Sequence, residues 1–498
     1  MTALSASSPT APPEGGVGPS ASLLGDHRPF LVALALGVLV RVWVQVAFVP
    51  AFVHSDAPTY LAALENLVPA PDRPLGYVLL LLLPASLVTP DVLLVALVQH
   101  VLGLALAVLL YVFLRRWGVG PRVSTVAALP VLLDTMQLSL EHAVLSDVLF
   151  EVLVFGALCL LCWHRRMRLF NALAAGLALG LAATVRLVGE PLVVVAVIGC
   201  VLLAGPGWRR RVAAIILVGV GFAVPVTTYM TWYHQERGGF TLAEFTGKAL
   251  YVRSASFVEC DQISVQEYQR VLCPREPVAQ RQDSTYYAFH DPQTLPMLRP
   301  PPGVTTDQAM REFAIAAIRA QPLDYTRTVV RDFSLNFDVW RGNRFSYDTA
   351  YKWRFKHFVT VQPTDWTGPA YAAHGGRQLQ SVQPFADGLV VYAWVVYLPG
   401  PLLLGAVVVA LGATLGIGRA ARRDALQARA VVCVLLLAGL LLLAAPAVGA
   451  QFVWRYQLPA LALVPAAAAL GWTILRGGGG GSQRELGAAG TEATASTD

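Results

Sequence analysis

Long apolar stretches, separated by short basic clusters, dominate the pattern of hydrophobic and polar positions along this chain. Each stretch holds roughly 18 to 25 residues, which as a helix is long enough to cross about 30 Å of hydrocarbon. The pattern therefore predicts an all-α polytopic membrane protein with about ten transmembrane helices. We expect these helices at residues 30–52, 91–114, 122–140, 144–163, 169–186, 189–206, 212–232, 388–415, 429–449 and 457–475.

The basic clusters indicate how the predicted helices are oriented, because short cytoplasmic loops are enriched in Lys and Arg. With the N-terminus in the cytoplasm, ten spans place the clusters at 115–116, 165–168, 209–211 and 419–423 on the cytoplasmic side. A further apolar stretch, 75–88, would reverse this arrangement if it crossed the membrane. We therefore predict it to be a short dipping or juxtamembrane helix on the external face.

This orientation also divides the chain into parts. Both ends are rich in small and polar residues and are expected to be disordered in the cytoplasm. The expected parts are the tail 1–28, the first seven helices at 29–232 with a first external loop at 53–90, a large external region at 233–387, the last three helices at 388–476 and the tail 477–498.

Composition agrees with a bilayer location and limits the classes of partner. Hydrophobic residues make up 55% of the chain and charged residues 14%, whereas a soluble domain carries about 25% charge. The net charge of +6 resides in clusters between apolar stretches, so it indicates membrane sidedness and no nucleic-acid partner. Abundant Ala, Leu, Val and Arg with little Lys is typical of a high-GC bacterium. We expect a multi-pass protein of a bacterial plasma membrane.

The six cysteines divide into two groups. Four of them, Cys159, Cys162, Cys200 and Cys433, lie in apolar stretches, where they are expected to pack among other side chains. Cys260 and Cys273 lie in the predicted external region, where thiols oxidise. We therefore predict a disulfide between these two, with two free thiols as the alternative.

Charged residues within or at the outer ends of the predicted helices mark the candidate site, because charge at membrane depth is energetically unfavourable and is often functional. Four external turns each carry such residues, and we expect these turns to converge on one polar cavity at the outer leaflet. The residues are Asp56 after the first helix, Glu141 and Asp147 between the third and fourth, Arg186 and Glu190 between the fifth and sixth, and Arg455 before the tenth. Arg41 lies within the first helix and needs a partner or a cavity.

Each of these residues also has a purely structural interpretation, and the sequence leaves these interpretations open. They are a helix cap for Asp56 before Pro58, an ion pair between Arg186 and Glu190, a wet crevice for Asp147 and Glu151, and a headgroup anchor for Arg455.

The order of short motifs along the chain resembles a known family. The motifs are Arg41 in the first helix, Asp56 and Tyr60 in the first loop, RPLGY at 73–77, RRWG at 115–118, Asp147 and Arg186 at helix ends, and RYQLP at 455–459 followed by Pro465. In order, spacing and sidedness they resemble the GT-C glycosyltransferases, in particular the branch of protein O-mannosyltransferases and lipid A aminoarabinose transferases. The resemblance covers about 30–235 and 388–475.

The resemblance implies a GT-C-like fold and an enzyme that takes a sugar from a polyprenyl phosphate carrier outside the cytoplasm. It places the carboxylate nearest the acceptor in the first external loop, which implies Asp56, and an acid at Asp147 that helps to order the site. Ala57 stands where the family often has a second acidic residue, and 233–387 matches only loosely. The sugar and the acceptor, whether protein, glycan or lipid, are therefore left open.

Sugar transfer from such a carrier needs a base for the acceptor hydroxyl and positive charge for the leaving phosphate. We expect Asp56 to be the base, with Asp147 as the second catalytic candidate, and a single displacement that inverts the anomeric centre. Candidates for phosphate binding are Arg455, Arg186, Lys248 and Arg253; Tyr60, Glu141, Arg41 and Glu190 are expected to support the site. No cofactor is expected, and because a paired Asp-x-Asp is lacking, a divalent metal is not required.

Two other classes of function remain open. A membrane transporter or lipid flippase would also place charges in an outward polar cavity, although transporters more often show internal repeats or broken helices near the midplane. A membrane scaffold protein is the third class. A sugar-transfer assay with membranes and a polyprenyl-linked donor discriminates among the three.

Overall fold

The computed structural model describes residues 20–342, 353–357, 379–421 and 425–477. The tails predicted at 1–28 and 477–498 therefore lie mostly outside the described residues. Helix α1 (Ser20–Ala47) begins earlier than predicted. Residues 20–28, which we expected to be disordered, are helical.

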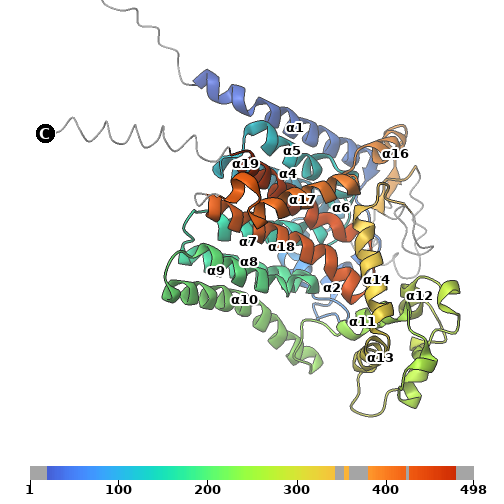
Figure 1. Cartoon of the computed structure of the whole chain (residues 1–498). Coiled ribbons are helices and arrows are strands. Elements are labelled where there is room, and N and C mark those ends of the chain that lie inside the picture. The colour runs from blue at the N-terminus through green and yellow to red at the C-terminus, as the bar shows by residue number, and fades with distance from the viewer. Residues whose placement is uncertain (1–19, 343–352, 358–378, 422–424, 478–498) are drawn as a thin grey trace, which may run out of the picture.

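Long helices run side by side and form the body of the molecule (Figure 1). Each predicted apolar stretch coincides with one helix or with a bent pair of helices. After α1 these are α4 (Val92–Arg116), α5 (Pro121–Leu133) with α6 (Thr135–Glu141), α7 (Asp147–Cys162), α8 (Leu169–Val185), α9 (Leu192–Leu203), α10 (Trp208–Arg237), α16 (Phe385–Val395) with α17 (Gly400–Leu415), α18 (Leu426–Gly449) and α19 (Leu458–Arg476).

Several of these helices have the length and composition of membrane spans. Within the described ranges, five helices are long and apolar enough to cross a bilayer, and the number rises to as many as seven if each bent pair is one span. Large apolar side chains such as Leu39 and Val42 of α1, and Ile216 of α10, are exposed on the outside of the body, as expected where lipid covers the surface. The protein is therefore an all-α membrane protein. Helices α7, α8 and α9 are shorter, with 16, 17 and 12 residues, so ten spans remain a prediction.

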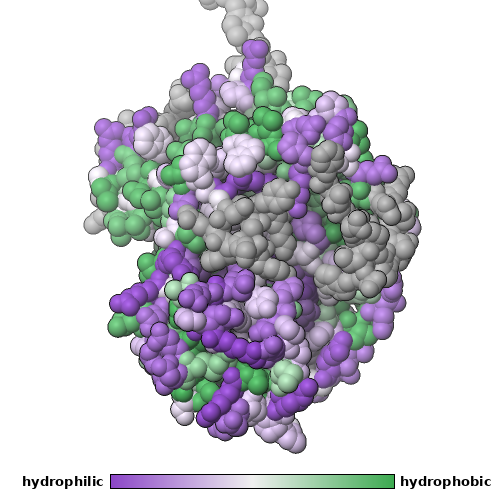
Figure 2. Space-filling view, turned by 90° about the vertical axis from the view of Figure 1, so that its right-hand side faces the viewer, coloured by the Kyte–Doolittle hydropathy of each residue, from purple (hydrophilic) through white to green (hydrophobic). Residues whose placement is uncertain are grey.

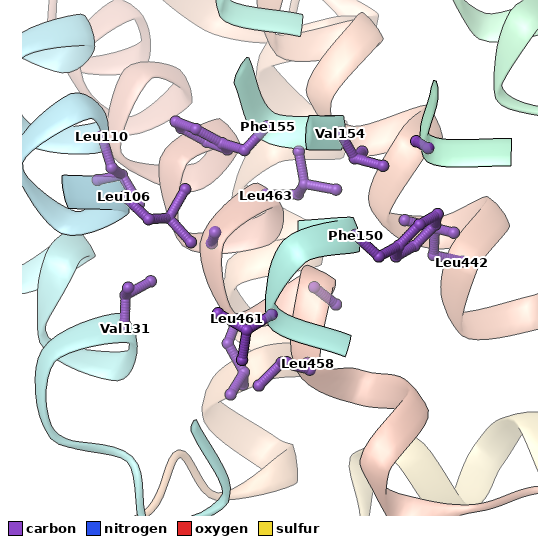
Figure 3. Packing of buried hydrophobic residues seen from close by; sticks show 14 of the residues in the cluster. Leu106, Leu110, Val131, Phe150, Val154, Phe155, Leu442, Leu458, Leu461 and Leu463 are labelled. Carbon is purple, nitrogen blue, oxygen red and sulfur yellow. The ribbon is translucent and has the colours of Figure 1, made fainter. Parts of the chain in front are cut away.

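Helix α19 lies at the centre of the body and contacts α4, α5, α7, α17 and α18. Apolar side chains from α4, α5, α7 and α18 lie around those of α19 (Figure 3). Association of helices in lipid depends on such close packing, because the lipid is as apolar as the side chains. The labelled residues of this core are Leu106, Leu110, Val131, Phe150, Val154, Phe155, Leu442, Leu458, Leu461 and Leu463.

Two pairs of helices, α5 with α6 and α16 with α17, are bent, and the two bends contact each other through Asp134. Helices α5 and α6 meet at 50°, and α16 and α17 at 47°. The Asp134 carboxylate accepts hydrogen bonds from the backbone N–H groups of Met136 (2.8 Å) and Leu398 (2.7 Å), and Arg341 binds it through both carboxylate oxygens. These bonds satisfy backbone groups that a break in a buried helix would otherwise leave unpaired.

Shorter helices occupy the connections. The first loop contains α2 (Ala57–Glu65), then a π-helical segment, Val78–Leu82, that continues into α3 (Leu83–Ser86). This segment falls in the stretch 75–88 predicted to be a short helix, and it is too short to span a bilayer. A two-residue strand, β1 (Phe48–Val49), pairs with β2 (Gln380–Ser381) and ties the end of α1 to the start of α16.

The region predicted to be external contains α11 (Thr246–Ala255), α12 (Ser284–Phe289), α13 (Thr306–Ala320) and α14 (Pro322–Ser334), which lie together at one end of the body (Figure 1). It has its own apolar cluster, which includes Tyr251, Leu272 and Phe313. Seen from this end, hydrophilic side chains gather over the lower part, where α11 to α13 lie (Figure 2). A polar surface at one end of an apolar body fits a region outside the bilayer.

The disulfide expectation can be tested by counting thiols. The structure joins Cys260 and Cys273, with 13 residues of sequence separation, and the other four cysteines are free. A bridge closing a loop of this length stabilises a fold by roughly 2–4 kcal/mol. Denatured, unreduced protein is expected to show four free thiols. Six free thiols would refute the bridge.

Sidedness can be tested by labelling the external region. Glu267 is 85% exposed and lies within the predicted external part. A Glu267→Cys variant, in a background without the four free cysteines, is expected to react with a membrane-impermeant maleimide on intact cells. Reaction only after permeabilisation would place 233–387 in the cytoplasm and contradict the predicted orientation.

Candidate active site

Asp56 lies just after β1 and immediately before α2. Its carboxylate contacts two arginines, Arg73 from the same loop and Arg455 from a distant segment. Arg73 Nη1 lies 2.7 Å from Oδ1, and Arg455 Nη2 lies 2.7 Å from Oδ2. The preceding residue, Ser55, has a φ of 59°, which is uncommon for a residue other than glycine and often marks a functional site. The Ser55 hydroxyl also accepts a hydrogen bond from Arg455 Nη1 at 3.3 Å.

These contacts determine the ionisation state of Asp56. Burial alone would raise its pKa, but the charges of Arg455 and Arg73 outweigh this and hold the pKa well below its ordinary value. Arg186 lowers it further. Within the described part of the chain, the Asp56 side chain makes no capping hydrogen bond to α2. The structure therefore favours an ion-pairing role for Asp56 over the helix-cap interpretation.

A second ion pair lies beside the first. Asp147, the first residue of α7, is 2.8 Å from Nη1 of Arg186, which follows α8. The Ser146 hydroxyl accepts hydrogen bonds from Arg186 Nη1 (3.3 Å) and from the Tyr60 hydroxyl (3.2 Å). Tyr60 belongs to α2, so Ser146 connects the Asp147 pair to the loop that carries Asp56. Arg186 thus pairs with Asp147, and the structure does not form the Arg186–Glu190 pair considered above.

Aromatic rings contact the guanidinium groups of Arg455 and Arg186. The guanidinium of Arg455 lies 4.9 Å from the centre of the Trp353 ring and 5.3 Å from that of Tyr456. The same Tyr456 ring is 5.4 Å from the guanidinium of Arg186. Cation–π contacts of this kind stabilise a desolvated guanidinium. Tyr456 therefore lies between Arg455 and Arg186 and joins the two pairs.

We refer to Asp56, Arg73, Asp147, Arg186 and Arg455 as the ion-pair cluster. The Asp56 side chain is 21% exposed and that of Asp147 only 4%, so Asp56 is the more accessible carboxylate. At the outer edge, Asp72 accepts a hydrogen bond from Arg73 at 2.7 Å. With Asp72 included, three guanidinium groups face three carboxylates. Every arginine of the cluster is already engaged by an acid of the protein itself.

Lys248 lies near the edge of this cluster. Its Nζ is 4.0 Å from the centre of the Phe289 ring. Burial lowers the pKa of Lys248, while the charge of Asp72 raises it and that of Arg73 lowers it. The Lys248 side chain is therefore within electrostatic range of Asp72 and Arg73.

Arg253, which we predicted to bind phosphate, lies elsewhere. It is fully buried and pairs with Asp332 at 2.6 Å. The same Asp332 oxygen accepts a hydrogen bond from the backbone N–H of Phe452 at 3.4 Å. Arg253 thus connects α11 to α14 and to the segment before α19. This arrangement indicates a structural role in place of phosphate binding.

Arg41 and Glu141, predicted to support the site, form a separate network inside the helical body. Arg41 donates to both carboxylate oxygens of Glu141, at 2.8 and 2.6 Å, and His100 Nδ1 lies 2.8 Å from Glu141 Oε2. Arg41 also donates to the carbonyls of Val131 and Leu132 at the end of α5. Glu190, the remaining predicted supporting residue, is exposed and forms no ion pair within the described ranges. None of the three contacts Asp56.

No protein-family model matches the chain, and no curated protein or solved structure is significantly similar to it. The resemblance to GT-C glycosyltransferases therefore stays an expectation from motifs, and the site must be interpreted from its own geometry.

Two residues of the site, Ser146 and Trp353, were not singled out from the sequence. Arg73 and Tyr456 were noted only as members of the RPLGY and RYQLP motifs, without a role of their own. A signal for Arg73 existed, because it is a basic residue in a loop predicted to be external, where Arg is infrequent. Trp353 lies in the long region predicted to be external, where no periodic pattern marks a contact with α19 or the segment before it. Only the fold shows that Trp353 covers Arg455.

Proposed function

We propose that the protein is a membrane glycosyltransferase that moves a sugar from a polyprenyl phosphate carrier to an acceptor hydroxyl, with inversion, on the external side of a bacterial plasma membrane. The observation that carries the proposal is the ion-pair cluster. It combines an accessible carboxylate with three guanidinium groups, drawn from segments far apart in the sequence. These are the base and the phosphate-binding cations that the reaction requires.

The reaction is a single displacement. The acceptor oxygen attacks the anomeric carbon, and its proton passes to the Asp56 carboxylate. The bond between that carbon and the phosphate oxygen breaks, and the electron pair stays on the phosphate. Arg455 and Arg186 stabilise the growing negative charge through hydrogen bonds. Because guanidinium groups supply the positive charge, the proposal requires no cofactor or divalent metal.

A small hollow lies next to Trp353. A small, partly open pocket has Trp353 and Trp454 in its wall, together with Arg341 and Arg354. Trp353 also contacts Arg455, so this ring lies between the pocket and the ion-pair cluster. The pocket itself has room for only a water-sized group, so the proposal rests on the cluster.

The test is turnover of a polyprenyl-phosphate-linked sugar by the purified protein in proteoliposomes. The proposal predicts release of polyprenyl phosphate from donor presented on the external side. A transporter is the second candidate. The buried network of Arg41, Glu141 and His100 favours it, because ionisable groups in membrane helices often mark transport pathways. Movement of the intact carrier between leaflets, without cleavage of the sugar–phosphate bond, would support the transporter.

Arg455 and Arg186 are expected to matter for donor binding more than for folding. Arg455→Ala and Arg186→Ala remove guanidinium groups that contact the phosphate, so each is expected to weaken donor binding about tenfold or more, since hydrogen bonds to charged groups contribute roughly 1.5–3 kcal/mol. Arg→Lys at either position is expected to retain only part of the wild-type donor affinity, because the planar fork of the guanidinium is lost. Titration of the donor into the folded variants measures these affinities.

Arg327 provides the matched control. It is 78% exposed on α14, so Arg327→Ala removes the same charge from the protein without touching the cluster. Its donor affinity is expected to equal that of the wild type. If Arg455→Ala and Arg186→Ala also retain wild-type affinity, the assignment of these arginines to the phosphate is wrong.

A further inference from the structure

We propose that Asp56 occupies, in the free protein, the position that the donor phosphate takes, and that phosphate binding releases Asp56 from Arg455 to act as the base. This inference rests on the proposed function and names what triggers the base: the phosphate anion of the donor.

The geometry of Arg455 supports an exchange of anions. Its Nη2 binds Asp56 at 2.7 Å, whereas its Nε has no hydrogen-bond partner among the described residues. A phosphate offers more acceptor oxygens than one carboxylate oxygen does, so it can engage both groups. Trp353 and Tyr456 contact the same guanidinium. Arg455 can therefore stay in place while one anion replaces another.

Release is needed because a carboxylate held by two guanidinium groups is a weak base. The charges of Arg455 and Arg73 hold the pKa of Asp56 well below its ordinary value, and an efficient general base has a pKa nearer the working pH. A phosphate that neutralises Arg455 removes one of these charges. The proton affinity of Asp56 then rises at the time when the sugar–phosphate bond is in place to react.

Arg73 has the complementary role of a positioning residue. It contacts the other oxygen of Asp56 at 2.7 Å and is itself held by Asp72. When the phosphate replaces Asp56 on Arg455, Arg73 keeps the carboxylate near the anomeric carbon. The exchange thus removes the contact between Asp56 and Arg455, while Arg73 still holds the Asp56 side chain.

Removing the competing carboxylate gives the test. Farnesyl phosphate serves as a soluble, short polyprenyl phosphate, and its affinity is measured by calorimetric titration of the full chain in nanodiscs. Asp56→Asn is expected to bind farnesyl phosphate about tenfold more tightly than the wild type. The uncharged alcohol farnesol is expected to bind Asp56→Asn and the wild type equally. Inorganic phosphate is expected to bind Asp56→Asn more tightly than the wild type, but more weakly than farnesyl phosphate does, because it lacks the chain.

Asp91→Asn is the control, because Asp91 accepts a hydrogen bond from the backbone N–H of Leu93 at the start of α4 and Asn caps a helix about as well. Its affinity for farnesyl phosphate is expected to be unchanged. Asp56→Ser is a second variant without the charge, for use if Asp56→Asn does not fold. Equal or weaker binding by the folded Asp56 variants overturns the exchange alone. No binding of farnesyl phosphate to any of the proteins overturns the proposed function and the exchange together.

Discussion

Replacing Asp56 with Asn is expected to leave the protein folded and to lower turnover of a polyprenyl-linked sugar by roughly 10²–10⁴-fold, the usual contribution of a positioned base. The amide keeps the size of the carboxylate and can accept a hydrogen bond from one arginine, but it cannot take the acceptor proton. The measurement is the initial rate of polyprenyl phosphate release, at saturating donor, by monodisperse protein.

Two variants separate this effect from other roles of an aspartate. Asp91→Asn changes a helix-capping residue and is expected to retain full turnover. Asp147→Asn changes the more buried carboxylate of the cluster and is expected to reduce turnover less than Asp56→Asn does. Near-wild-type turnover by folded Asp56→Asn, combined with a large loss in Asp147→Asn, would move the base to Asp147.

The largest expected effect on stability comes from Arg41. The Arg41 guanidinium and the Glu141 carboxylate are 3% and 0% exposed, and Arg41→Leu would leave the carboxylate buried without its arginine. Breaking such a pair destabilises a protein by about 3–5 kcal/mol. We expect the Arg41→Leu protein to aggregate at temperatures at which the wild type stays monodisperse, as measured by size-exclusion chromatography after heating.

The double variant Arg41→Leu/Glu141→Gln is expected to recover part of this loss of stability, because it removes the unpaired charge and keeps hydrogen-bonding groups.

Gly103 offers an independent test of whether the packing around Glu141 contributes to stability. A Cβ at this position would lie 1.8 Å from Glu141 Oε1, whereas one at Gly156 would meet nothing within 4 Å. Gly103→Ala is expected to lower thermal stability and Gly156→Ala to be tolerated. Equal stability of Arg41→Leu and wild type would show that the network contributes little.

Most helices could be predicted from the sequence because a long apolar stretch satisfies its backbone hydrogen bonds in lipid only as a helix. The stretch 91–114 became α4 (Val92–Arg116), and 457–475 became α19 (Leu458–Arg476). The breaks after Leu133 and Val395 could not be predicted. They depend on Asp134 and Arg341, which lie 207 residues apart, and apolar periodicity carries no information about such a contact.

The site could be predicted in part. Charges at the outer helix ends indicated Asp56, Asp147, Arg186 and Arg455, and the structure brings these four together. The pairing was not predictable, since Arg186 lies four residues from Glu190 in sequence but binds Asp147 through the fold.

Three residues predicted to belong to the site, Arg41, Glu141 and Arg253, form ion pairs away from Asp56. Glu141 and Arg41 stand at depths where a charge can line a cavity or pair inside the bundle, and only packing shows that they pair. Arg253 belongs to a region without helical spans, where nothing in the sequence indicated its contact with Asp332. In each case, a contact between distant segments decides the role of the charge.

A structure determined with bound polyprenyl phosphate tests whether the ion-pair cluster binds the donor phosphate. We expect the phosphate to lie within hydrogen-bond distance of the Arg455 guanidinium, with Arg186 nearby and Asp56 displaced from Arg455 toward Arg73. A phosphate bound elsewhere on the protein, with the Asp56–Arg455 pair intact, would contradict it.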